Sequence, residues 1–243
     1  MTRGKIQTAI RLIYPPRCIG CGALVEEEFG LCAACWRETP FIGGLVCDSC
    51  GVPLIGPDLG QPEHCDDCLA APPPWGQGRA ALIYRDNARR LVLRLKHADR
   101  PDLARAAGGW MARCAAPLLR PGMIVVPVPL HPRRLLMRRY NQAALLAREV
   151  ARRLGLDCCP DLLIRPRLRG SLDGLSQDAR HQRMQGAIGA HPRRRHLLAG
   201  RPVLLVDDVM TSGATFHAAT RACAGAAAGD VNVLALARVA KRD

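Results

Sequence analysis

Apolar and polar positions change in regular blocks along residues 79–243, and these blocks predict strands and helices in turn. Continuous apolar runs predict buried strands, whereas apolar positions three or four residues apart predict helices with one buried face. The expected strands are 80–84, 123–128, 162–164, 203–206 and 231–239, and the expected helices are 87–97, 103–119, 141–154 and about 214–227. Strands that alternate with helices are typical of an α/β fold with a mainly parallel sheet flanked by helices.

The first seventy residues follow a different pattern. Ile6, Ile10 and Ile13 predict one face of a short helix, and the residues after it are rich in cysteine. Residues 69–78 are rich in proline and glycine, which predicts a semi-rigid linker. We therefore expect two domains, a small module over 1–70 and the α/β domain over 79–243.

Eight of the twelve cysteines form four Cys-x-x-Cys pairs before residue 70. The pairs are Cys18/Cys21, Cys32/Cys35, Cys47/Cys50 and Cys65/Cys68. Two such pairs supply four thiolates to one tetrahedral ion, so the sequence predicts two structural zinc ions in a double zinc ribbon. Pairing of neighbours along the chain and crossed pairing, first with third and second with fourth, both fit this spacing. We expect His64 to be a bystander beside Cys65.

Two adjacent carboxylates, Asp207 and Asp208, follow the apolar run 203–206, and a small polar loop follows them. At the carboxyl end of a parallel strand, these acids would face the crevice in which open α/β sheets bind ligands. Backbone N–H groups and hydroxyls of the loop, at the start of the next helix, would bind an anion. A ribose 5-phosphate, with its vicinal hydroxyls beside a phosphate, fits this arrangement.

The stretch VLLVDDVMTSGAT, residues 203–215, resembles the signature of type I phosphoribosyltransferases. The whole chain resembles the ComF/GntX family, in which a cysteine-rich zinc module precedes a phosphoribosyltransferase-like domain. The further residues that carry this resemblance are 95–97, 127–130, 138–142, 174–176, 180 and 186–187. The chain departs from the family pattern at Leu172, Arg183 and Ile188, where a glutamine, an asparagine and a phenylalanine are usual.

The resemblance implies a site for phosphoribosyl pyrophosphate (PRPP) together with Mg²⁺. Asp207 and Asp208 would hold the ribose hydroxyls, and with Lys96 they form the expected catalytic set. The loop expected to hold the 5-phosphate consists of Val209, Met210, Thr211, Ser212, Gly213, Ala214 and Thr215. Arg133 and Arg138, from a basic loop after the strand 123–128, are the expected contacts to pyrophosphate.

The formal net charge of +14 leaves two functions open. One is an enzyme that transfers the phosphoribosyl group from PRPP to an acceptor. The other, implied by the family, is a non-catalytic protein that handles single-stranded DNA during DNA uptake, with PRPP or a nucleotide as regulatory ligand and DNA-uptake proteins as partners. Arginine supplies 32 of the 35 basic residues, which suits phosphate contacts but is equally typical of a solvated surface.

Charged and polar residues interrupt the first thirteen positions, so we expect no export signal there. No apolar stretch is long enough to span a bilayer. We therefore expect a cytoplasmic protein, and the expected lack of an export signal also argues against a disulfide framework for the eight cysteines.

Overall fold

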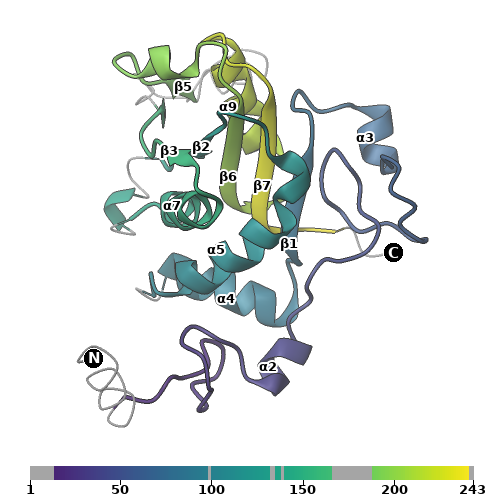
Figure 1. The fold of residues 1–243 in the computed structure, drawn as a ribbon, viewed down its shortest axis with the longest axis vertical. Coiled ribbons are helices and arrows are strands. Elements are labelled where there is room, and N and C mark those ends of the chain that lie inside the picture. The colour runs from purple at the N-terminus through teal and green to yellow at the C-terminus, as the bar shows by residue number, and fades with distance from the viewer. Residues whose placement is uncertain (1–13, 98–99, 132–134, 138–139, 166–187, 241–243) are drawn as a thin grey trace, which may run out of the picture.

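The main sheet has five strands, all parallel, in the order β1-β7-β6-β2-β3 (Figure 1). The computed structural model describes residues 14–97, 100–131, 135–137, 140–165 and 188–240. The strands are β1 (Gly78–Ile83), β2 (Ile124–Pro127), β3 (Asp157–Cys158), β6 (Val203–Met210) and β7 (Val231–Arg238). Within the described chain, the expected mainly parallel α/β fold is thereby confirmed.

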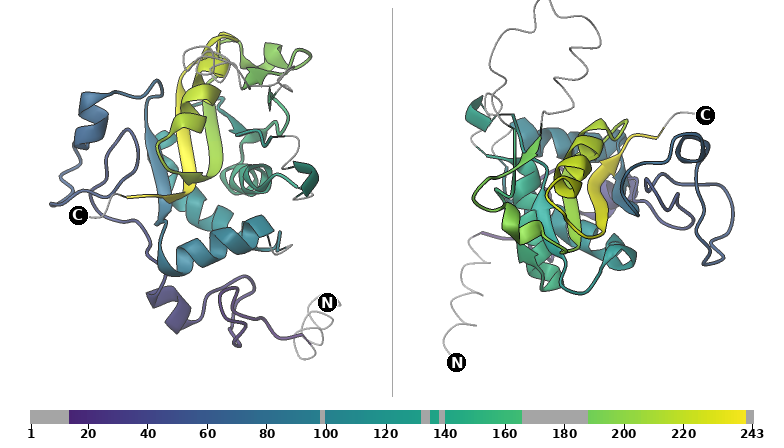
Figure 2. Two further views of the ribbon diagram at one scale, coloured as in Figure 1. Left: turned by 180° about the vertical axis from the view of Figure 1, so that it is seen from behind. Right: turned by 90° about the horizontal axis from the view of Figure 1, so that it is seen from above.

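Helices cover both faces of this sheet (Figures 1 and 2). One face carries α4 (Asp86–His97), α5 (Leu103–Cys114) and α7 (Gln142–Leu154), and the other carries α9 (Ala214–Ala224) and the short 3-10 helix η2 (Arg195–Leu198). Strand β6 shows why two cores form, because successive side chains of a strand point to opposite faces. Leu204 and Val206 enter the core beneath α4, α5 and α7, whereas Val203 and Leu205 enter the core beneath α9.

Two of the expected elements take a different form in the structure. The helix expected over 103–119 ends at Cys114 and continues only as a 3-10 turn, η1 (Ala116–Leu118), because Pro117 has no N–H to extend the helix. The strand expected over 162–164 does not join the main sheet. It forms β4 (Leu163–Ile164), which pairs antiparallel with β5 (Gly189–Ala190) in a separate two-stranded sheet.

The N-terminal module lies against β1, the edge strand of the main sheet. Its short helices are α2 (Ala33–Arg37) and α3 (Asp66–Ala70). Between its two cysteine groups, Phe41 bridges antiparallel to Leu82, and the N–H of Ile42 donates to the carbonyl of Ala81 at 2.9 Å. The guanidinium of Arg94 on α4 donates to backbone carbonyls of the first cysteine group.

The proline-rich segment expected as a linker is anchored to the domain. Trp75 is buried, and the N–H of Gly76 donates to the carbonyl of Val231 at 2.9 Å. In the part of the chain that the structure describes, no helix is both long and apolar enough to cross a membrane.

Candidate ligand site and metal centres

A crevice opens beside β6 where its neighbour β2 ends. Pro127 pairs with Val206, and beyond this point β6 continues only beside β7, from Asp207 opposite Ala235 to Met210 opposite Arg238. The strand is therefore longer than the expected 203–206, because β7 supports it for four more residues. The two acids lie in this extension, at the carboxyl ends of the parallel strands, where such sheets bind ligands.

A cavity of about 280 Å³ fills this crevice. Its polar lining residues are Tyr84, Lys96, His131, Asn141, Gln142, Arg165, Asp207, Asp208, Thr211 and Thr215. They come from β6 and from the segments that follow β1, β2 and β4, from the end of α4 and from the start of α7 and α9. The cavity thus gathers acidic, basic and hydroxyl side chains from segments that are far apart in the sequence.

Lys96 reaches the cavity from the last turn of α4 and lies against one of the acids. Its Nζ is 3.2 Å from Asp208 Oδ1, and both side chains are more than four-fifths buried. Two contacts fix the end of α4: the hydroxyl of Tyr140 donates to the carbonyl of Leu95 at 2.8 Å, and Gln142 Nε2 donates to the carbonyl of Lys96. The lysine that the family resemblance singled out is therefore close to the paired acids.

Asp207 has a different environment from its neighbour. Burial of its carboxyl group, with the charge of Asp208 beside it, raises the pKa of Asp207 to about 8. Its Oδ1 accepts a hydrogen bond from the N–H of Asp208 at 2.8 Å, which partly offsets this effect. The site accordingly carries less negative charge at neutral pH than two free aspartates would.

The loop after β6 presents the start of α9 to the same crevice. Gly213 caps α9 with a left-handed backbone, φ +78°, which glycine adopts without the steric cost of a side chain. Since Gly213 has no side chain to bond the first N–H groups of α9, these groups are available to an anion. Arg238 at the end of β7 anchors the start of the loop, because its Nη1 donates to the carbonyl of Thr211 at 2.6 Å.

The eight predicted zinc ligands form two groups of four. One group is Cys18, Cys21, Cys32 and Cys35, and the other is Cys47, Cys50, Cys65 and Cys68. Within each group all four sulfur atoms lie within 4.8 Å of one another. Pairing therefore follows the order of the chain, and the crossed alternative is excluded. His64 is not a ligand: its Nδ1 is 3.0 Å from Ser49 Oγ.

The chemistry of both groups fits zinc. All four donors are thiolate sulfurs, which zinc accepts in closed tetrahedral sites that leave no position for a substrate. Hydrogen bonding to the Cys50 thiol, together with backbone hydrogen bonds, lowers the pKa of Cys47 to about 4, so a thiolate is available to the ion at neutral pH. Both centres are consequently structural.

Comparison with known proteins agrees with this arrangement. A family model described as "Double zinc ribbon domain" matches residues 9–69. The "DNA utilization protein YhgH" of Salmonella typhimurium is 31% identical over 211 residues, which cover 84% of this chain and 88% of that protein. The chain belongs to the ComF family. "Competence protein F" of Haemophilus influenzae is 27% identical over 91% of this chain and 96% of its own length.

Solved structures similar to this ComF-family chain match part of it. The "glutamine phosphoribosylpyrophosphate (PRPP) amidotransferase" of B. subtilis, complexed with ADP and GMP, is 20% identical over 58% of this chain and 30% of its own, with a TM-score of 0.42. A structure titled "the allosteric regulatory enzyme of purine biosynthesis" is 23% identical over 59% of this chain and 30% of its own, also with a TM-score of 0.42.

Not every expected site residue of this ComF-family chain lies in the cavity. Lys96, Asp207, Asp208, Val209, Thr211 and Thr215 line it together. Ser212 and Ala214 are exposed on the same loop, whereas the side chain of Met210 is buried in the core beneath α9. Arg133 and Arg138 lie outside the described residues, as do Leu172 and Arg183. Ile188, which replaces the usual phenylalanine, is buried in the core.

Five polar residues of the cavity were not among the expected site residues, namely Tyr84, His131, Asn141, Gln142 and Arg165. Tyr84 directly follows β1, so its place at the carboxyl end of a parallel strand was a usable signal. Asn141 has a structural task in addition, because it accepts from the N–H of Ala143 at the start of α7 and donates to the carbonyl of Val128. Arg165 follows the short antiparallel strand β4, and no sequence pattern connects it to the acids.

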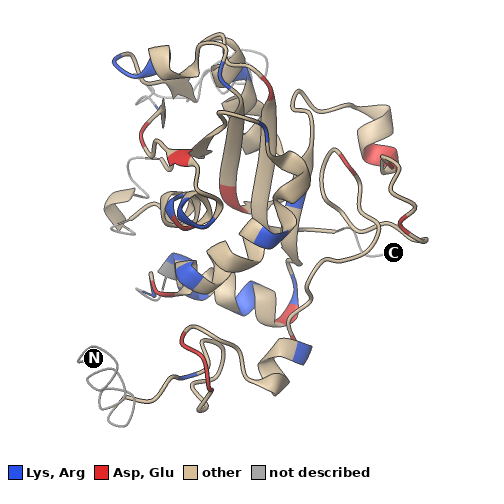
Figure 3. Cartoon of the chain, viewed as in Figure 1, with Lys and Arg blue, Asp and Glu red and all other residues tan. Residues whose placement is uncertain are grey.

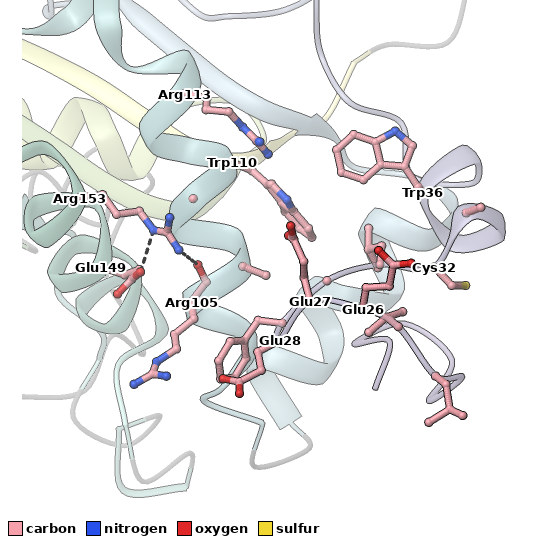
Figure 4. A pocket seen from close by; sticks show the side chains of 18 of the residues that line it. Glu26, Glu27, Glu28, Cys32, Trp36, Arg105, Trp110, Arg113, Glu149 and Arg153 are labelled. Atoms are coloured by element: carbon pink, nitrogen blue, oxygen red, sulfur yellow. Dashed lines mark hydrogen bonds and ion pairs between the residues drawn. The ribbon is translucent and has the colours of Figure 1, made fainter. Parts of the chain in front are cut away.

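A larger cavity of about 1200 Å³ lies between the first zinc ribbon and helices α5 and α7 (Figure 4). Glu26, Glu27 and Glu28 line its ribbon side, and Arg105, Arg113, Arg152 and Arg153 line its helix side. Two of these arginines, Arg152 and Arg153, form ion pairs with Glu149 at 2.7 Å. Four acidic and four basic side chains thus line this cavity, so its lining has no excess of positive charge.

The remaining cysteines of this ComF-family chain have the character of packed side chains. Burial raises the pKa of Cys114 and of Cys158 to about 11, and that of Cys223 to about 12. The thiol form therefore dominates at neutral pH, and these three residues are poor nucleophiles.

Proposed function

We propose that this ComF-family chain binds PRPP together with Mg²⁺ in the cavity beside β6. The observation that carries the proposal is the convergence of Asp207, Asp208, Lys96 and the start of α9 on one cavity of about 280 Å³. Paired acids suit the two hydroxyls of a ribose, and the uncapped N-terminus of α9 suits its 5-phosphate. The distance in the chain between Lys96 and the acids argues against a chance arrangement of neighbouring residues.

Each group has a distinct task in this proposal. Asp207 and Asp208 accept hydrogen bonds from the ribose hydroxyls, and Thr211 and Thr215 add hydroxyl donors to the N–H groups of α9 around the 5-phosphate. When PRPP binds, the ammonium group of Lys96 leaves Asp208 and donates a hydrogen bond to an oxygen of the pyrophosphate. Mg²⁺, when bound together with PRPP, would supply positive charge beside the pyrophosphate, and the carboxylates of Asp207 and Asp208 have the oxygen donors that suit it. Arg133 and Arg138 remain the proposed further contacts to pyrophosphate.

We further propose that bound PRPP is a substrate. An acceptor nucleophile forms a bond to C1 of the ribose, the C1–oxygen bond to pyrophosphate breaks, and both bonding electrons leave with the pyrophosphate. Lys96 offsets the negative charge that develops on the leaving group, and the fixed ribose aligns C1 with the acceptor. This reaction needs no covalent intermediate with the protein.

Calorimetric titration of the zinc-loaded protein with PRPP and Mg²⁺ tests the binding. The matched control is the double variant Asp207→Asn with Asp208→Asn, which preserves side-chain size and removes both charges. We expect wild-type binding and its loss in the variant, with zinc content and thermal unfolding preserved. Equal affinities in the two proteins would refute the site. Release of pyrophosphate, followed with candidate nitrogen acceptors, then tests the transfer.

A second candidate function, the handling of single-stranded DNA, is supported by a basic surface. Helices α4, α5 and α7 carry several arginines (Figure 3). The exposed ones are Arg89, Arg90, Arg94, Arg105, Arg113, Arg148, Arg152 and Arg153. The same helices contain only two acids, Asp86 and Glu149. The names of the relatives, a DNA utilization protein and a competence protein, agree with this function.

Charge reversal separates this candidate from the first. Arg113→Glu with Arg148→Glu should weaken binding of single-stranded DNA and reduce its salt dependence, since each arginine releases counterions when it contacts a phosphate. Arg195→Glu with Arg221→Glu, on η2 and α9 at the opposite face of the sheet, is the matched control with the same change in net charge and should leave DNA affinity nearly unchanged. Equal effects of both changes would indicate only a general response to net charge.

Two broader expectations complete the proposal. We propose that the chain is divided into a module over 1–70, which holds both zinc centres, and a domain over 79–243, which holds the cavity. Eight thiolates reserved for zinc also fit a reducing compartment, so we propose that the protein acts in the cytoplasm, with DNA-uptake proteins as partners.

A further inference from the structure

One side chain, Trp75, connects the second zinc centre with the loop before α9. Its Nε1 donates to the carbonyl of Ser49 at 2.6 Å, and Ser49 lies between the zinc ligands Cys47 and Cys50. At its other end the indole lies against Gly213, where an added Cβ would be 3.0 Å from Trp75 Cη2. The indole also packs edge-on against His217 in the first turn of α9, with ring centroids 4.9 Å apart.

The position of Trp75 is fixed by its neighbours in the chain. The N–H of Gly76 donates to the carbonyl of Val231 at 2.9 Å, and the N–H of Gln77 donates to Asn232 Oδ1 at 2.9 Å. Both acceptors belong to β7, in the centre of the fold. These bonds fix the backbone next to Trp75, and because the residue is only 7% exposed, neighbouring atoms enclose its indole.

The zinc centre is fixed against the same sheet. The N–H of Gly78 donates to the carbonyl of Asp48 at 2.8 Å, and Arg79 forms an ion pair with Asp48 at 2.6 Å. The approach is so close that a Cβ on Gly78 would lie 2.4 Å from the carbonyl oxygen of Ser49. Zinc sets the backbone between Cys47 and Cys50, so it also sets the carbonyl that holds Trp75.

We propose that the second zinc ribbon positions the loop 211–215 for the 5-phosphate, and that Trp75 is the positioning residue through which it acts. This inference rests on the proposed function of the loop. The loop needs such support because its central residue is a left-handed glycine without a side chain of its own. A loop that is held in its binding conformation before the ligand arrives binds more tightly, since less ordering remains to be done.

Titration with ribose 5-phosphate tests the role of Trp75. Trp75→Phe keeps an apolar ring but removes the N–H donor and the part of the indole that reaches Gly213. We expect its affinity for ribose 5-phosphate to fall about tenfold, with two zinc ions retained. Trp36→Phe, the same change at a half-exposed tryptophan of the first ribbon, is the matched control and should leave the affinity unchanged. Equal affinities of Trp75→Phe and wild type would overturn the proposal.

A double-mutant cycle tests whether the ribbon acts through Trp75. Cys65→Ser removes one ligand of the second centre and should weaken ribose 5-phosphate binding to a similar extent. Cys21→Ser, at the first centre, is its control. If the ribbon acts through Trp75, Cys65→Ser combined with Trp75→Phe should bind no more weakly than the weaker single variant. Additive losses would show two independent effects and overturn the proposal.

Hydrogen exchange tests the positioning role of Trp75 independently of the proposed function of the loop. In the ligand-free protein, peptides that cover 207–220 should exchange about tenfold faster in Trp75→Phe than in wild type or Trp36→Phe. Faster exchange without ribose 5-phosphate binding by wild type would refute the proposed function and leave the positioning role supported. Unchanged exchange together with wild-type binding would refute the positioning role alone.

Discussion

Lys96 and Asp208 form an ion pair in the cavity beside β6, with 3.2 Å between Nζ and Oδ1, although 112 positions separate them in the chain. Each group thus has a partner within the protein itself. Asp207 beside Asp208 has a different environment, because burial and the neighbouring carboxylate raise its pKa. Binding of PRPP would replace this ion pair by two contacts to the ligand, one from Lys96 to the pyrophosphate and one from Asp208 to a ribose hydroxyl.

The variant Lys96→Met tests whether Lys96 contacts the pyrophosphate group of PRPP rather than its ribose 5-phosphate. We expect its affinity for PRPP to fall about tenfold or more, because a charged hydrogen bond to the pyrophosphate is lost. Its affinity for ribose 5-phosphate, which lacks the pyrophosphate, should change much less. Parallel titrations with the two ligands measure this difference. An equal loss for both would place Lys96 elsewhere than beside the pyrophosphate.

Asp207→Asn should stabilise the ligand-free protein in a pH-dependent way. The folded-state pKa of about 8 lies above that of an unfolded aspartate, so the fold favours the protonated form. The contribution of this one carboxyl group to the free energy of unfolding is thus fully present below the unfolded pKa and is lost as the pH rises toward about 8. Asparagine does not titrate. The gain in Tm over wild type should be larger at about pH 8.5 than at about pH 6, and a gain that is constant with pH would contradict this environment for Asp207.

Gly213→Ala combines backbone strain with a steric contact. At φ +78° a side chain costs about 1–2 kcal/mol, and its Cβ would also press on Trp75. Gly155→Ala is the matched control, since Gly155 has φ +66° and no atom within 4 Å of an added Cβ. We expect a larger fall in Tm for Gly213→Ala, and a loss of PRPP affinity in that variant only. Equal falls in Tm for the two variants would mean that Trp75 can move away from the added methyl group without a loss of stability.

Elemental analysis should find about two zinc ions per chain. Cys21→Ser, at an exposed ligand of the first centre, should lower this number to about one, because the second centre uses other cysteines. Cys114→Ser is the control: its thiol donates to the carbonyl of Met111, outside both groups, and the variant should retain both ions. A total loss of zinc from Cys21→Ser would indicate that the two centres fold as one unit.

The sequence predicted the parts of this protein that local spacing or a long apolar run specifies. Four Cys-x-x-Cys pairs predicted both zinc centres, and the run before Asp207 predicted the central strand. The length of β6 was missed, since it depends on the partner β7 rather than on its own residues. The choice between the two cysteine pairings was likewise not available from spacing alone. Arg165 and the contact of Trp75 with Gly213 depend on tertiary packing, and no periodic pattern encodes them.

The segment 40–42, which pairs with β1 through Phe41 and Ile42, has a consequence for the behaviour of the protein at high concentration. The free edge of a sheet offers unpaired N–H and C=O groups, and strands of other molecules add to such an edge during aggregation. Here the chain occupies one edge with its own backbone, and the strand at the other edge, β3, is only two residues long. The segment 40–42 of the zinc module thus blocks the addition of strands from other molecules to β1, and loss of the module would expose the edge of β1 to other chains.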